Sequence, residues 1–103
     1  MSVVKVYKGD SCDLMLRVTS KGEDFMLNGY TCTLTIKKGN TVLLTKDAEP
    51  EDIIDNTAAF RLTQEDLNHD AGEYKYVVVI TKDDAVPPFR RTVSVGDFII
   101  QNA

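Results

Sequence analysis

Apolar and polar residues alternate along most of this chain, and stripes with helical spacing are nearly absent. The clearest case is residues 30–37, where Tyr, Cys, Leu and Ile occupy one face and Thr and Lys occupy the other. A period of two is typical of a strand with one buried face. Alternating stretches at 3–7, 12–18, 57–62 and 73–81 predict further strands in the same way.

Turn-forming residues separate these stretches. Lys38-Gly39-Asn40-Thr41 predicts a hairpin, because Gly and Asn tolerate a positive φ, and residues 41–45 are expected to pair back. Ser20–Asp24 is expected to be a polar turn, and Ile53-Ile54 a stub of strand. Thr63-Gln64-Glu65-Asp66 fits an N-cap followed by acidic residues, which predicts one helical turn.

The last strand is expected over residues 90–101. Pro87-Pro88, just before it, cannot join a hydrogen-bonded ladder. Gly96 is expected to form a bulge within the strand. The whole pattern gives roughly seven to nine short strands, which is typical of an all-β antiparallel sandwich. The length of 103 residues suits a single domain over residues 1–103.

Charge and hydropathy narrow the classes of partner. The chain has 12 basic and 16 acidic residues and a net charge of −4, so no nucleic-acid partner is expected. No apolar run is long enough to span a bilayer, and the N-terminus has no apolar signal core. These features predict a protein made in the cytoplasm, with no signal peptide and no membrane partner.

The segment Leu67–Tyr76 resembles the corner that leads into strand F of immunoglobulin-type domains, whose pattern is Asp-x-Gly-x-Tyr-x-Cys. Leu67 would plug the end of the core, and Asp70 would hydrogen-bond turn amides. Gly72 would permit the change of direction, and Tyr74 would return its hydroxyl to the corner backbone. The alternative is an ordinary turn before a tyrosine-rich strand. With this corner, the expected fold is an immunoglobulin-like sandwich.

One position departs from that pattern, because Tyr76 stands where the family has Cys. The inter-sheet disulfide of the family is therefore excluded, although Cys12 occupies an early-strand position like that of the missing partner. Cys12 and Cys32 match no metal-binding spacing and are expected to be buried thiols, with a Cys12–Cys32 bridge as the alternative.

Several phrases share an order with one particular group of proteins. They are Tyr7-Lys8-Gly9-Asp10-Ser11, Met26-Leu27-Asn28-Gly29-Tyr30-Thr31, Ile36-Lys37-Lys38-Gly39-Asn40, Asn56-Thr57-Ala58-Ala59-Phe60-Arg61-Leu62-Thr63 and the corner at Asp70–Tyr74. In this order they resemble the N-terminal domain of phage baseplate upper proteins and related tail modules, in which Thr often stands where this chain has Asn28. The resemblance implies a virion structural part that docks on other tail proteins, as a homo-oligomer such as a trimer.

Candidate catalytic groups are sparse, so we expect no enzyme and no cofactor. His69 is the only histidine and lies beside Asp70, but no serine sits in a Gly-x-Ser-x-Gly turn. The acidic residues between Asp47 and Asp55 lack the spacing of a calcium loop and are interpreted as solvated.

The segment Val86–Arg91 is the best candidate for a partner contact. Phe89, Arg90 and Arg91 follow two prolines, and aromatic and arginine side chains concentrate binding energy at interfaces. The alternative is that Phe89 packs into the edge of the sandwich. An immunoglobulin-like adhesion or carbohydrate-binding module of a bacterial surface protein is the second functional hypothesis. Its candidate aromatic residues are Tyr7, Tyr30 and Phe89.

Overall fold

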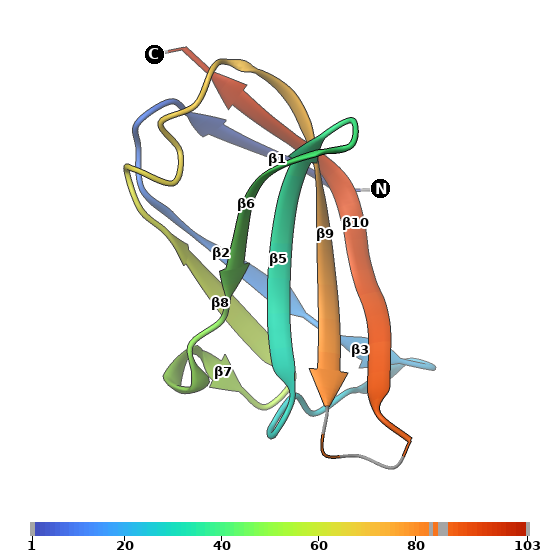
Figure 1. The fold of residues 1–103 in the computed structure, drawn as a ribbon. Coiled ribbons are helices and arrows are strands. Elements are labelled where there is room, and N and C mark those ends of the chain that lie inside the picture. Colours follow the sequence, from blue (N-terminus) through green and yellow to red (C-terminus); the bar gives the residue numbers. More distant parts are fainter. Residues whose placement is uncertain (1, 83, 85–86, 103) are drawn as a thin grey trace.

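The computed structural model describes residues 2–82, 84 and 87–102 (Figure 1). Strands dominate this part of the chain, and the helical element found in it is the short 3-10 helix η1 at Pro50–Asp52. The strands are β1 (Ser2–Tyr7), β2 (Cys12–Arg17), β3 (Thr19–Ser20), β4 (Glu23–Asp24), β5 (Thr31–Lys38), β6 (Thr41–Asp47), β7 (Ile53–Ile54), β8 (Thr57–Leu62), β9 (Gly72–Lys82) and β10 (Phe89–Gln101). The prediction of an all-β chain is confirmed.

The strands form two main layers. One is a five-stranded sheet in the order β1-β10-β9-β5-β6, and the other is a three-stranded sheet in the order β2-β8-β7 (Figure 1). Strands β1 and β10 are parallel, and the other pairs within both sheets are antiparallel. The third, smaller sheet is the hairpin of β3 and β4.

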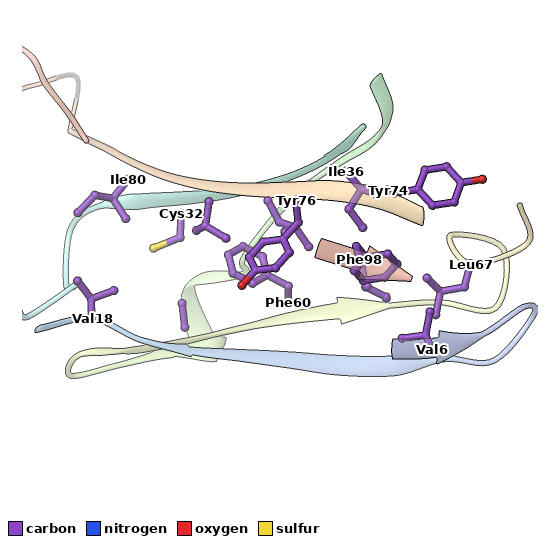
Figure 2. Close-up of a cluster of buried hydrophobic side chains, with 14 of the residues drawn as sticks. Val6, Val18, Cys32, Ile36, Phe60, Leu67, Tyr74, Tyr76, Ile80 and Phe98 are labelled. Carbon is purple, nitrogen blue, oxygen red and sulfur yellow. The ribbon is translucent and has the colours of Figure 1, made fainter. Parts of the chain in front are cut away.

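The hydrophobic core lies between the two layers, as Figure 2 shows. Strand β9 faces it with the four residues that the alternation predicted, Tyr74, Tyr76, Val78 and Ile80. Phe60 of β8 lies opposite them, and Phe98 of β10 beside them (Figure 2). The inward faces predicted for 30–37, 57–62 and 73–81 therefore form one core, except that Tyr30 precedes β5 and is half-buried.

Two tight turns shape the ends of the sandwich. The hairpin predicted at Gly39 is present with a φ of 60°, and β6 continues past Thr45 to Asp47. The stretch Ser20–Asp24, expected to be only a polar turn, is the end of the β3–β4 hairpin. Lys21 and Gly22 have φ values of 55° and 80° there. Positive φ at both central positions suits the twist of a two-residue hairpin.

The bulge in β10 is not at Gly96, so that prediction was wrong. Gly96 pairs in register with Tyr76, and the register shifts instead between Thr92 and Ser94. Gly96 is buried on the core side of β10, opposite Tyr76. A bulge adds one residue to a strand, so the core-facing positions are odd-numbered on one side of it and even-numbered on the other. For this reason Arg91, which pairs with Ile80, lies on the core side of β10.

The segment after β8 forms a single turn, closed by the Leu67 amide donating to the Thr63 carbonyl at 3.2 Å. The Asp66 amide donates to Thr63 Oγ1 at 3.1 Å, and the Thr63 amide donates to Asp66 Oδ2 at 2.9 Å. This reciprocal pair is the arrangement of a capping box, as the N-cap prediction required. The Lys46 ammonium of β6 also donates to Asp66 Oδ2 at 2.8 Å. Asp66 therefore joins the five-stranded sheet to the turn that follows β8.

Because of these contacts, we expect acid to weaken the fold through Asp66. Its pKa lies below the ordinary 3.8, first because Lys46 donates a hydrogen bond to the carboxylate and then because the Thr63 amide does. A carboxylate whose pKa is lowered by folding contributes its full stabilisation at pH values above the unfolded-state pKa of about 4. This contribution to the free energy of unfolding is lost as the pH falls through the folded-state pKa. We expect Asp66→Asn to be less stable than the natural protein at pH ~7, with the difference shrinking below about pH 4. Urea unfolding of both proteins across this range checks it, and a difference that did not change with pH would contradict it.

Candidate partner-binding surface

Three aromatic rings close one end of the sandwich. Phe25 lies 5.5 Å from Tyr30 and 6.3 Å from Phe89, and Tyr30 lies 5.4 Å from Phe89, measured between ring centroids. Two cations cover them: Lys82 Nζ is 5.3 Å from the Tyr30 centroid, and the Arg91 guanidinium carbon is 5.5 Å from the Phe89 centroid. Phe89 is half-buried against the core. Its ring therefore packs at the edge of the sandwich, and the Arg91 guanidinium lies over this ring.

The two arginines after Phe89 lie on opposite sides of β10. Arg90 pairs with Thr81 and is exposed on the outer face of the five-stranded sheet. Arg91 instead lines a groove of about 260 Å³ at the end of the β2 strand. Arg17 lines the same groove from the other layer, together with Phe25 and Thr92. Among the described residues, neither Arg17 nor Arg91 takes part in an ion pair.

The chemistry of this arrangement is that of a site for an anionic group. Arginine on an aromatic ring loses little side-chain freedom when it binds, and its planar fork recognises carboxylates. The groove offers two guanidinium groups, those of Arg17 and Arg91. The surface defined by Arg17, Phe89, Arg90 and Arg91 is called the arginine end below.

The corner that sequence reasoning identified lies at the opposite end of the core (Figure 2). Leu67 is completely buried there, and the Tyr74 hydroxyl donates to the Asp70 carbonyl oxygen at 2.7 Å. The backbone of Asp70, rather than its exposed side chain, provides this contact. Gly72 begins β9. The structure therefore does not bring the corner residues together with Phe89, Arg90 and Arg91.

Both cysteines are free thiols. Cys12 pairs with Leu62 at one end of the three-stranded sheet, and Cys32 pairs with Ile80 at the far end of the other layer. Burial raises the pKa of both thiols, and nearby carboxylates raise it further, Asp13 and Asp10 for Cys12 and Asp47 for Cys32. The Cys12–Cys32 bridge left open by the sequence does not match this placement.

Tyr76 lies in the interior, between the two layers (Figure 2). With Leu14 and Leu16 of β2 it lines a small cavity between the layers. Its hydroxyl lies 3.3 Å from Ser94 Oγ, so the polar end of the ring has a partner.

Two of the acidic loop residues, Asp47 and Asp52, make local hydrogen bonds. Arg61 binds Asp52 with two hydrogen bonds of 2.8 and 2.7 Å, which lower the Asp52 pKa, and the Thr33 hydroxyl donates to Asp47 at 2.7 Å.

His69 is half-buried in the corner loop. No three His, Cys, Asp or Glu residues in the described part of the chain come together as a metal would require. Within the same part, no helix has the length and apolar character needed to cross a membrane.

The sequence singled out Phe89, Arg90 and Arg91 but gave no signal for Arg17 and Phe25, which the structure places beside Arg91 and Phe89. Arg17 ends an ordinary alternating strand, and no local pattern places it beside Arg91. That proximity depends on the position of the β10 bulge and on how the two layers pack.

A search of protein-family models and a search of curated proteins both gave no match to this chain.

Proposed function

We propose that this chain is an immunoglobulin-like structural module of a phage or prophage tail or baseplate, and that it acts by docking on other tail proteins. The strand orders support the immunoglobulin-like part of the proposal. Strands β5, β9 and β10 are neighbours as strands C, F and G are in such domains, and β2, β8 and β7 follow the order B, E and D. The Tyr74–Asp70 hydrogen bond is the contact of a tyrosine corner.

The arginine end is the observation that carries the docking proposal. Rigid aromatic and arginine side chains are the residue types that dominate binding energy at interfaces. Here Arg91 is held over Phe89, and Arg90 is free to reach a partner from the outer face. The three arginines of this end are positively charged, which favours an acidic group on the partner surface.

The adhesion or carbohydrate-binding alternative has less support from the same residues. Sugar sites in sandwiches use exposed aromatic faces, whereas Tyr30 and Phe89 are half-buried in the aromatic cluster. Tyr7 alone among the three candidates is half exposed, at 50%. Its neighbours on the outer face of β1 are Lys5 and Val3 rather than a second ring.

The test reverses the charge of the arginine end. We expect Arg90→Glu with Arg91→Glu to weaken binding to the tail proteins encoded beside this chain by tenfold or more, because two favourable charges become repulsive. Phe89 stays unchanged, since its loss would disturb the core. Light scattering of mixtures after size exclusion measures complex formation, and titration calorimetry measures affinity.

The matched control is Lys5→Glu with Lys8→Glu, which changes net charge equally at exposed positions of another region. It should bind like the natural protein. Equal weakening by both variants, or a natural protein that binds none of its encoded neighbours, would overturn the docking proposal.

A further inference from the structure

Strand β2 leaves one side of the three-stranded sheet open. It pairs with β8 on one side, and no strand among the described residues pairs with its other side. The inner side chains of β8 are fully buried, but those of β2 remain only half-buried. The outer side chains of β2 are exposed, with Met15 at 74%. This open margin is called the β2 edge below.

A small apolar cavity opens along the same edge. It has a volume of about 70 Å³, and its walls include Leu14 and Leu16 of β2, Val4 of β1 and Phe60 of β8. A well-packed sandwich covers such residues, so this seam has apolar surface that an added strand could cover.

Backbone groups on the β2 edge are available for pairing. Just past the end of β2, the Val18 amide donates to the Asn56 carbonyl at 2.8 Å, toward the β8 side. Amides in an antiparallel ladder point to alternate sides, so those of Leu14 and Leu16 also point to β8. The amides and carbonyls of Asp13, Met15 and Arg17 therefore point to the open edge. Unpaired groups of this kind are a template for another strand.

The charges of β2 are complementary to those of a second, antiparallel β2 strand. From Asp13 to Arg17 it reads Asp-Leu-Met-Leu-Arg. We propose that a second copy of this chain adds its β2 strand antiparallel to the β2 edge, about a two-fold axis through Met15. Met15 then faces Met15 of the second copy, and Leu14 faces Leu16. Asp13 of each copy faces Arg17 of the other, so both ends of the pair are held by opposite charges.

The choice of a second copy rests on this charge pattern. Opposite charges directly across two strands stabilise the pair, and like charges destabilise it, so the pattern selects one register. Two strands of six residues bury less than the roughly 1,600 Å² of a standard interface. The dimer is therefore weak, with a dissociation constant on the order of 10 µM to 1 mM. The β2 edge and the arginine end share Arg17. The inference does not rest on the proposed function, because the docking test changes Arg90 and Arg91, which take no part in the β2 pair.

Disulfide trapping tests the register. Facing residues that exchange hydrogen bonds have Cα atoms about 5.5 Å apart, which suits a disulfide. In a Cys12→Ser background, Met15→Cys should form covalent dimers at least tenfold faster than Arg17→Cys, whose two copies would lie ~14 Å apart. Non-reducing gels at about 100 µM protein, a concentration within the expected range of association, measure both rates. Equal rates for the two variants would overturn the register.

Charge variants test the partner. Arg17→Glu alone gives an acidic β2 and Asp13→Lys alone gives a basic one, so each should remain monomeric. An equimolar mixture should recover the dimer, because each mismatch becomes a match. Asp13 lies opposite Arg61 on β8, so circular dichroism must show that Asp13→Lys is folded. Met15→Lys, at an exposed position, is the second variant and should abolish association.

Sedimentation equilibrium up to about 1 mM protein, the weak limit of the expected range, decides the result. A dimer of the natural protein that Met15→Lys abolishes, together with recovery in the charge mixture, supports the proposal. A natural protein that stays monomeric over this range, or a dimer that Met15→Lys leaves intact, overturns it.

Discussion

Replacing Phe60 by Ala is expected to lower the free energy of unfolding by about 3–5 kcal/mol. Phe60 is only 1% exposed and lies between the two layers, facing β9 (Figure 2). Its removal loses the transfer energy of the ring and leaves a cavity beside the one that Leu14 and Tyr76 already line. Domains of this size are stable by only 5–15 kcal/mol or so, so the variant would lose a large part of its stability.

Urea unfolding followed by circular dichroism measures this loss. The midpoint should fall while the slope stays the same, because the surface exposed on unfolding hardly changes. Met15→Ala is the matched control, since it also removes an apolar side chain but from an exposed position. It should change the free energy of unfolding by less than about 0.5 kcal/mol. Similar losses in both variants would contradict the placement of Phe60 at the centre of the core.

The core was predictable because it depends on local alternation. A period of two assigned the buried faces of β5, β8 and β9 from sequence alone, and the structure buries those faces. The Gly39 turn was equally local, since it needs only residues that tolerate positive φ. These features require no knowledge of which strands become neighbours.

The features that the sequence did not reveal depend on contacts between distant segments. Gly96 looked like a bulge, but it pairs in register with Tyr76 across the ladder. The bulge near Val93 in turn decides that Arg91, rather than Arg90, faces the groove. Which residues of a strand face the core beyond a bulge cannot be predicted until the position of the bulge is known. The composition of the arginine end was therefore predicted only in part.

The open β2 edge follows from the same topology. Strand β1 pairs with β10 in the five-stranded sheet, so it does not cover β2. The three-stranded sheet is left with a free margin next to the apolar seam. The outer face of β2 is also the place where alternation puts both charges and Met15. The β2 edge and the arginine end meet at Arg17, which ends β2 and lines the groove with Arg91.

Replacing Leu67 by Ala is expected to lower the free energy of unfolding by about 2–5 kcal/mol. Leu67 is completely buried at the corner, where it closes the end of the core (Figure 2). Its backbone is also engaged: its amide donates to Thr63, and its carbonyl accepts a hydrogen bond from Gly9 at 3.1 Å. The variant keeps those backbone bonds, so the loss measures the buried side chain.

Asn68→Ala provides the matched control for that corner. Asn68 is the next residue in the same loop, and it is exposed. Its replacement should change the free energy of unfolding by less than about 0.5 kcal/mol. Both variants keep the bond from the Tyr74 hydroxyl to the Asp70 carbonyl, so any difference between them reports how much the core depends on being closed at this end. If Leu67→Ala unfolded at the same urea concentration as Asn68→Ala, the corner would be an ordinary surface turn, and the main local support for an immunoglobulin-like fold would be lost.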